Sequence, residues 1–171
     1  SATAGNSFTV SLATGAGNTY VLDSGTVSGA NFTTDALTVS APDSTPPTVT
    51  ATGGPPDTQQ FVPLNVIVDR TFSEALASGT ITTSNISLKR CTAADQSTAA
   101  SACASLDATN RCDTVELFTT RVLCNHTDLS TELWYAFTLG TGITDSASNA
   151  LATAAVYRFK TSSINGGSNN T

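Results

Sequence analysis

The chain has 171 residues, enough for one domain of ordinary size and an extension. Charged residues make up only 12% of the sequence, and the formal net charge is −6. Seven basic residues spread along an acidic chain form no patch for a phosphate backbone, so nucleic-acid binding is not expected. No apolar run approaches the roughly 20 residues of a membrane span.

Residues 1–45 are predicted to be an extended N-terminal arm. Within it Phe8, Val10 and Leu12 alternate with Ser and Thr, which predicts a strand with one apolar face. The arm holds too few apolar residues for a core of its own. We therefore interpret it either as a donor strand for another copy or as the remnant of a preceding repeat.

A proline-rich stretch at 41–47 is typical of the start of a domain. From there to residue 163, short runs of alternating apolar and polar residues are separated by turn signals. The expected strands are Thr48–Thr52, Asn65–Phe72, Thr80–Leu88, Asp113–Leu117, Arg121–Cys124, Leu133–Leu139 and Val156–Thr161. This pattern predicts an all-β fold, an antiparallel Ig-like β-sandwich over 46–163, followed by a flexible tail at 164–171.

Two of these strands should supply much of the core. Val68 and Phe72 share one face of the strand that begins at Asn65. The run LWYAFTL is the most apolar strand, and its large aromatic side chains, Trp134, Tyr135 and Phe137, are expected to be buried.

The four cysteines are Cys91, Cys103, Cys112 and Cys124. Their spacing lacks the C-x-x-C pairs of zinc sites, and the single His126 adds no second imidazole. We predict two disulfides rather than four reduced thiols, which implies an oxidising, extracytoplasmic setting. Three pairings are possible. We favour Cys91–Cys103 and Cys112–Cys124, because the second pair would close a hairpin near Phe118 and leave 91–112 as a stapled surface insertion.

Four N-x-S/T sequons are candidate glycosylation sites, at Asn31, Asn85, Asn125 and Asn169. The motif is short, and chance explains any one of them in a bacterial protein. In an archaeal or eukaryotic glycoprotein we expect several to carry sugar and to lie on the surface.

Residues that could perform chemistry are sparse. A Ser/His/Asp triad would need His126, which lies in a loop-like sequence and is expected to be solvated. Asp69 and Glu74 could be paired carboxylates, but the strand pattern turns Asp69 outward. Asp145 and Asn149 are weak candidates for calcium ligands, and an Asx-type turn explains both without an ion. The sequence therefore predicts neither an enzyme nor a cofactor.

Three stretches, VPLNVIVDRTFSEAL, GITDSASNAL and YRFKTSS, follow one another in this order. As an ordered set they resemble the bacterial Ig-like module repeated in S-layer and other large surface proteins, over residues 46–163. Ser148 stands where that family usually has Gly, so a differently shaped turn is expected there. The resemblance implies a β-sandwich with a structural or adhesive role outside the cell and no catalytic residues.

Two functions follow from these observations. In the first, the protein is a subunit of an extracellular filament or surface layer, and the strand at Phe8, Val10 and Leu12 adds to a neighbouring copy by donor-strand complementation, as in pili. Head-to-tail contacts of this kind propagate into a homopolymer. In the second, it is an adhesive or carbohydrate-binding module of a larger surface protein, and Trp134 or Tyr135, if exposed, contacts surface glycans.

Overall fold

The computed structural model describes residues 42–92 and 103–163. The chain divides into two units, and the second, Thr45–Thr171, contains the fold described below. The predicted arm strand at Phe8–Leu12, the sequons at Asn31 and Asn169, and the tail at 164–171 lie outside the described residues. Within those residues, no helix is long and apolar enough to cross a membrane.

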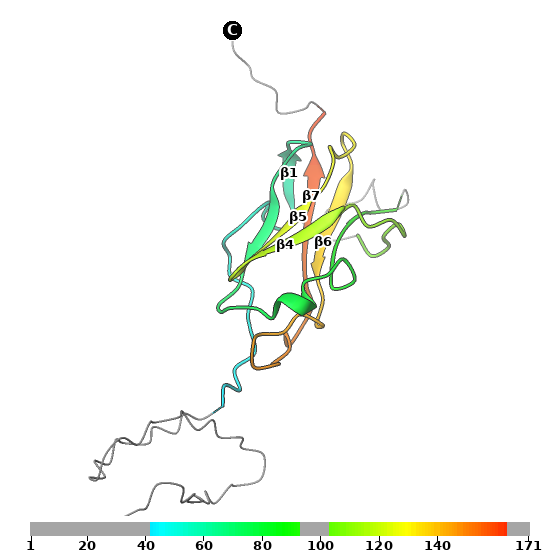
Figure 1. The fold of residues 1–171 in the computed structure, drawn as a ribbon. Coiled ribbons are helices and arrows are strands. Elements are labelled where there is room, and N and C mark those ends of the chain that lie inside the picture. Colours follow the sequence, from blue (N-terminus) through cyan, green and yellow to red (C-terminus); the bar gives the residue numbers. More distant parts are fainter. Residues whose placement is uncertain (1–41, 93–102, 164–171) are drawn as a thin grey trace, which may run out of the picture. The chain divides into compact units, whose positions relative to one another are not determined.

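In the described part of the chain, seven strands form two sheets that pack against each other (Figure 1). One sheet has the order β1-β7-β6-β3 and the other β2-β5-β4. The strands are β1 (Gln59–Val62), β2 (Val68–Thr71), β3 (Ile86–Arg90), β4 (Thr114–Phe118), β5 (Arg121–Asn125), β6 (Trp134–Leu139) and β7 (Ala155–Thr161). One short 3-10 helix, η1 (Ser78–Thr80), lies between β2 and β3. The predicted all-β sandwich is confirmed.

The first part of the domain contributes to both sheets. Residues 48–52 bond to the outer side of β2, and the chain then crosses to the other sheet as β1. β1 runs parallel to β7, whereas the other pairs of neighbouring strands are antiparallel. With residues 48–52 included and β1 set aside, the strand order is that of a constant-type immunoglobulin sandwich.

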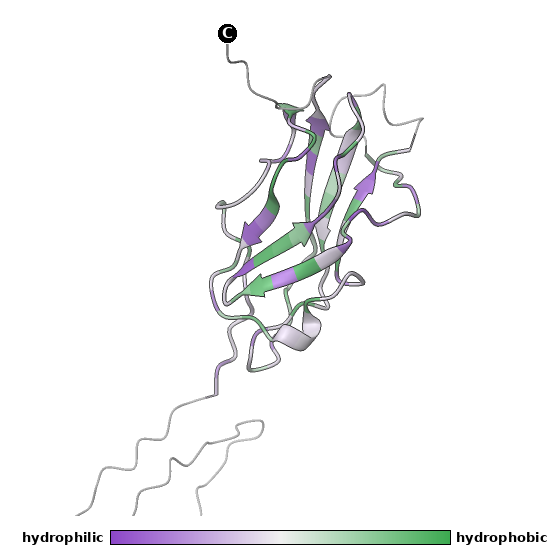
Figure 2. Ribbon diagram, turned by 45° about the horizontal axis from the view of Figure 1, so that its top comes forward, coloured by the Kyte–Doolittle hydropathy of each residue, from purple (hydrophilic) through white to green (hydrophobic). Residues whose placement is uncertain are grey.

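The core lies between the sheets and draws on both of them. Val68 and Phe72, predicted from the alternation, are 0% and 2% exposed. Trp134 and Tyr135 of β6 are 4% and 2% exposed, and Tyr135 stacks on the Phe159 ring at a centroid distance of 6.0 Å. Figure 2 shows apolar residues on strands of both sheets. Each large apolar side chain buried in this way stabilises the fold by about 1.5–3 kcal/mol.

Four elements differ from the prediction. The expected strand Thr48–Thr52 is an isolated bridge at Val49, and the strand expected from Asn65 begins only at Val68. β1 was not expected, and its burial pattern of one buried residue after three exposed ones shows no alternation. The strand expected from Thr80 begins only at Ile86. The residues before it form a turn, in which the Asn85 N–H donates to the Thr82 carbonyl at 3.0 Å. Thr, Ser and Asn favour such turns because their side chains compete for backbone groups.

Candidate functional site at the sheet edges

Each sheet of a sandwich ends in two edge strands, whose outward backbone groups can pair with another chain unless something covers them. The four edge strands here are β1 and β3 in one sheet and β2 and β4 in the other. Since both functions suggested by the sequence involve contacts with other molecules, we consider each edge in turn.

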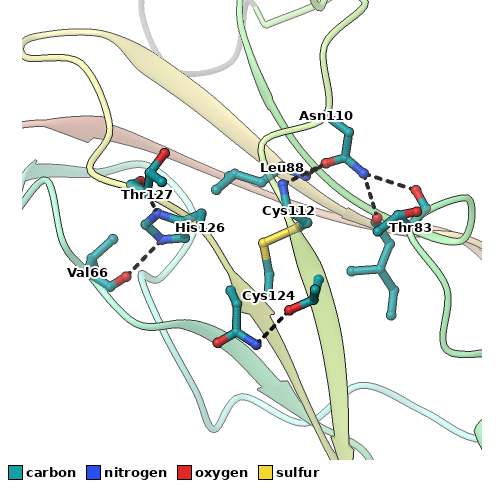
Figure 3. The surroundings of a disulfide bond; sticks show 11 residues. Val66, Thr83, Leu88, Asn110, Cys112, Cys124, His126 and Thr127 are labelled. Carbon is teal, nitrogen blue, oxygen red and sulfur yellow. Dashed lines mark hydrogen bonds between the residues drawn. A yellow bond between two sulfur atoms is a disulfide. The ribbon is translucent and has the colours of Figure 1, made fainter.

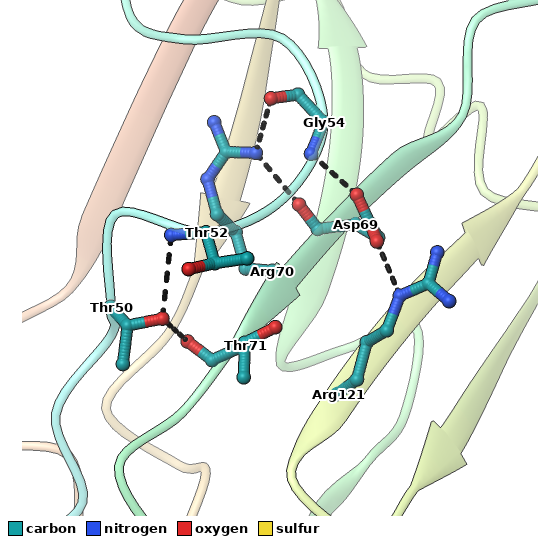
Figure 4. Close-up of polar contacts among 7 residues, drawn as sticks. All are labelled: Thr50, Thr52, Gly54, Asp69, Arg70, Thr71 and Arg121. Carbon is teal, nitrogen blue, oxygen red and sulfur yellow. Dashed lines mark hydrogen bonds and ion pairs between the residues drawn. The ribbon is translucent and has the colours of Figure 1, made fainter.

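Residues 48–52 close the edge of β2 (Figure 4). The Thr50 N–H donates to the Thr71 carbonyl at 2.8 Å, and the Thr71 N–H donates to the Thr52 carbonyl at 3.1 Å. Just after this segment, Gly53 has φ 126°, and a Cβ there would lie 2.7 Å from the Asp69 carbonyl oxygen. Glycine is therefore required where the chain passes so close to β2.

Two charged residues of β2 hold the crossing segment in place (Figure 4). The Asp69 carboxylate accepts a hydrogen bond from the Gly54 N–H and forms an ion pair with Arg121 of β5. The Arg70 guanidinium donates to the Gly54 carbonyl at 2.8 Å and to the Pro55 carbonyl. Asp69 does lie on the outward face, but the crossing segment and Arg121 cover it, so it is only 6% exposed.

Arg70 lies on the inward face of β2, as do the apolar Val68 and Phe72, and is 2% exposed. Its guanidinium carbon lies 3.7 Å from the centroid of the Tyr157 ring, on β7 of the opposite sheet. Burial lowers the pKa of Arg70, and Tyr157 and Asp69 partly offset this effect. The buried cation thus connects the two sheets and the segment that crosses between them, and the sequence pattern gave no sign of it.

The last part of the 91–112 insertion closes the edge of β3 (Figure 3). The Asn110 side-chain oxygen accepts from the N–H groups of Leu88 at 2.9 Å and Cys112 at 3.0 Å. Its amide nitrogen donates to the carbonyls of Thr83 at 3.0 Å and Ile86 at 3.1 Å. Two backbone groups of the same segment complete the closure: the Arg111 N–H donates to the Leu88 carbonyl at 2.7 Å, and the Asp107 N–H donates to the Arg90 carbonyl at 2.9 Å.

The disulfides hold this closing segment to the sandwich. Cys91 is joined to Cys103, and Cys112 to Cys124, which is the pairing favoured from the sequence. The first bridge ties Cys91, directly after β3, to Cys103 within the insertion. The second ties the start of the β4–β5 hairpin to β5 (Figure 3). Each closes a separation of 12 residues, for which the loop-entropy model gives a stabilisation of about 3 kcal/mol.

The β1 edge is open but irregular. The register between β1 and β7 shifts between Gln59 and Val62. Thr58 and Phe61 have φ of 68° and 61°, in the left-handed region that L-residues rarely adopt. Pro56 and Pro63 flank the strand. Prolines and irregular backbone are devices that keep edge strands from pairing with other chains.

The β4 edge is open and regular. Thr71 faces away from β5, because its N–H and C=O bond residues 50 and 52. Antiparallel ladders alternate between hydrogen-bonded and non-hydrogen-bonded pairs. Thr71 pairs with Arg121, and because Thr71 faces away from β5 this pair is not hydrogen-bonded. The backbone groups of Arg121 therefore point away from β2 and toward Phe118 of β4, with which Arg121 pairs.

It follows from this alternation that the backbone groups of Thr114, Glu116 and Phe118 bond to β5. The backbone N–H and C=O groups of Val115 and Leu117 point away from β5. The outer edge of β4 thus presents two N–H donors and two C=O acceptors. None of the residues that the structure describes forms a backbone hydrogen bond to these four groups.

Comparison with known proteins agrees with this architecture. The sequence model of a family described as Bacterial Ig-like domain matches residues 43–161. The chain belongs to this family. Domains of the family occur in bacterial surface proteins, so this Ig-like domain is a module of the surface-protein type. Neither a curated protein nor a solved structure matches the chain.

The two calcium candidates come together in a turn of this Ig-like domain. One carboxylate oxygen of Asp145 accepts from the N–H groups of Ala147 and Asn149, each at 2.8 Å. The other accepts from the Asn149 side-chain amide at 2.8 Å. Burial raises the pKa of Asp145, but the hydrogen bonds from Asn149 and Ala147 outweigh burial and bring the pKa below its ordinary value. Asp145 therefore acts as the acceptor of an Asx-type turn.

The side chains of the two described sequons are engaged in hydrogen bonds. The Asn85 amide donates to the Thr80 carbonyl at 2.8 Å. The Asn125 amide donates to Thr114 and Glu116 of β4 at 3.1 and 2.6 Å. Both asparagines are half-buried. These amides contribute to local packing in the unmodified domain.

Other candidate residues of the Ig-like domain are less accessible than the sequence suggested. His126 was expected to be solvated, but it is half-buried and its Nε2 lies 2.9 Å from the Val66 carbonyl oxygen (Figure 3). Trp134 and Tyr135 are buried, so neither can provide a stacking platform for a sugar ring. The platform considered for a carbohydrate-binding role is therefore ruled out.

Proposed function

We propose that this Ig-like domain is a structural subunit of an extracellular filament or surface layer. Copies join when the N-terminal arm of one adds as a strand to a sheet of the next. The observation that carries this proposal is the β4 edge, which has a regular ladder and whose outward backbone groups are bonded by none of the described residues.

The sequence of the arm supports the same function. Phe8, Val10 and Leu12 place three apolar side chains on one face of a predicted strand. Such a strand binds a sheet edge through its backbone and fills the edge of the core with its alternate side chains. Because donor and acceptor are different surfaces, the contact is head-to-tail and extends into a polymer.

The setting of the proposed subunit is outside the cell. Its family occurs in bacterial surface proteins, and its two disulfides persist in oxidising compartments. The proposed role needs no catalysis. In keeping with it, the Asp145 carboxylate and the His126 imidazole both hydrogen-bond groups of the domain itself.

Deletion of residues 1–14 tests this function. The full chain should sediment as polymers whose size grows with concentration, and the deleted chain should remain a folded monomer with an unchanged circular dichroism spectrum. A second variant, Val10→Asp in the full chain, should act like the deletion because a charge on the apolar face cannot be buried. Polymerisation of the deleted chain to the same extent would overturn the proposal.

A further inference from the structure

We infer that β4, and not β1, receives the arm, and that its occupant is Phe8–Leu12 of a second copy, held by the backbone groups of Val115 and Leu117. This inference rests on the proposed function and specifies its joint. β4 has five residues, and so does the apolar-alternating run from Phe8 to Leu12. Offset by one residue, so that two of the arm's apolar residues lie opposite Val115 and Leu117, the two segments can pair over four residues of β4.

The backbone of β4 offers hydrogen-bonding groups to such a partner. Val115 and Leu117 each direct an N–H and a C=O outward, and their neighbours are already bonded to β5. A strand pairing here would satisfy all four groups. Each hydrogen bond is individually weak in water, so several in register are needed for a stable joint.

The side chains of β4 match the arm in their alternation. Val115 and Leu117 are half-buried and pack against the core, whereas Thr114, Glu116 and Phe118 are exposed on the opposite face. Paired strands place directly opposite residues on the same face of the sheet. Apolar side chains of the arm opposite Val115 and Leu117 would thus cover the open flank of the core, and its Ser and Thr side chains would face solvent.

Charge favours the same pairing. The single charged residue of β4 is Glu116, and the chain carries no charged residue before Asp23. An uncharged strand can therefore approach this edge without repulsion. At β1 the left-handed residues Thr58 and Phe61 interrupt the ladder that a new strand would need.

Amide hydrogen exchange of the full chain measures the joint directly. In dilute monomer, the amides of Val115 and Leu117 should exchange quickly and that of Glu116 slowly, because only Glu116 is bonded to β5. In the assembled protein, exchange at Val115 and Leu117 should slow by about tenfold or more. Protection at these amides that does not change on dilution would mean that the arm binds its own domain, which contradicts the inference.

Proline substitution provides the second test. Val115→Pro removes one outward N–H at a position where an edge strand tolerates proline, and it should raise the concentration needed for polymerisation by about tenfold or more. Val115→Ala is the matched control, since it trims the side chain and keeps the N–H, so it should retain most of the assembly. If Val115→Pro fails to fold, the exchange experiment on the unmodified chain still decides.

A synthetic peptide of residues 6–14 completes the design. Added in excess to the full chain, it should occupy the β4 edge, stop polymer growth and protect the amides of Val115 and Leu117. If the chain polymerises through its arm but these amides stay unprotected, the inference is wrong and the proposed function stands. If the full chain does not polymerise at all, both fail.

Discussion

Arg70 is a buried cation on the core face of a strand, and the fold depends on it in an unusual way. Removing the guanidinium leaves the Gly54 and Pro55 carbonyls without their donor and the Tyr157 ring without its cation. We predict that Arg70→Met lowers the free energy of unfolding by about 3 kcal/mol, because it leaves buried acceptors unsatisfied. Urea unfolding followed by Trp134 fluorescence measures this loss.

Arg90 provides the matched control for Arg70. It forms an ion pair with Asp107 at 3.4 Å, but its side chain is 44% exposed. Exposed pairs are screened by solvent, so Arg90→Met should cost only about 0–1 kcal/mol. Equal losses for the two substitutions would show that burial of Arg70 has no special role.

Ser148 offers a stabilising substitution. It has φ 72° and an exposed side chain, in the turn that the Asp145 side chain closes. A left-handed backbone costs an L-residue about 1–2 kcal/mol, and glycine escapes most of this cost. We predict that Ser148→Gly raises the free energy of unfolding by about 0.5–1 kcal/mol.

Ser146 is the control for this effect. It is equally exposed and lies in the same turn, but its φ is not positive. Ser146→Gly should therefore leave stability unchanged or lower it slightly, because glycine gains entropy in the unfolded chain. Thermal melts of both variants compare them, and a gain at Ser146 equal to that at Ser148 would argue against backbone strain.

Asp145 gives the domain a component of stability that depends on pH. Burial raises its pKa, but hydrogen bonds from Asn149 and Ala147 outweigh burial and hold the pKa below the ordinary 3.8. A depressed pKa means that its stabilisation is complete above pH 3.8 and is lost as the pH falls through the folded value. Urea unfolding between pH 5 and pH 2 should show this loss, and Asp145→Asn should flatten it; an unchanged slope would contradict the assignment.

Residue patterns in the sequence predicted the apolar core but not its polar exceptions. Alternation placed Val68 and Phe72 in the core, and both are buried. The same alternation places Arg70 on that face. The residues near Arg70 in the sequence do not indicate that it contacts the Tyr157 ring and two backbone carbonyls there. Those partners come from segments far apart in the chain, so only the tertiary fold reveals them.

Asn110 shows how a single side chain can replace part of a strand. Two of its four hydrogen bonds reach β3, at Leu88 and Ile86, and the other two hold the chain at Thr83 and Cys112. Asn110→Ala leaves two N–H groups and two carbonyls unpaired, and we predict a loss of about 2–3 kcal/mol in the free energy of unfolding. Hydrogen exchange at the Leu88 amide should accelerate in parallel.

Asn125→Ala is the matched control for Asn110→Ala. Its amide also bonds two partners, but those bonds lie in exposed surroundings on the β4–β5 hairpin. The loss should stay within about 0.5–1 kcal/mol. If the two substitutions proved equally costly, the closure of the β3 edge would not depend on Asn110.

Strands that pair with a neighbour in the sequence were predicted better than strands that pair with a distant segment. The β4–β5 hairpin followed from alternation around Phe118 and from the spacing of Cys112 and Cys124, and both strands lie within about two residues of the prediction. β1 was missed because its pairing with β7 is parallel and joins residues about 100 positions apart. Such long-range pairing leaves no periodic signal in a four-residue strand.

At the scale of the whole molecule, the sequence predicted the sandwich but not the state of its edges. Residues 48–52, the segment that contains Asn110, and the irregular β1 protect three edges by three different means. β4 alone among the described strands has a regular ladder with outward groups that no described residue bonds. This asymmetry is what we would expect of a subunit with one defined acceptor surface.

Electron microscopy of the purified full-length chain tests the central claim most directly. If copies join through an arm and an open edge, the grids should show unbranched polymers of constant width, and their length should increase with protein concentration. Isolated particles of single-domain size at every concentration, from protein whose disulfides are intact, would contradict the claim.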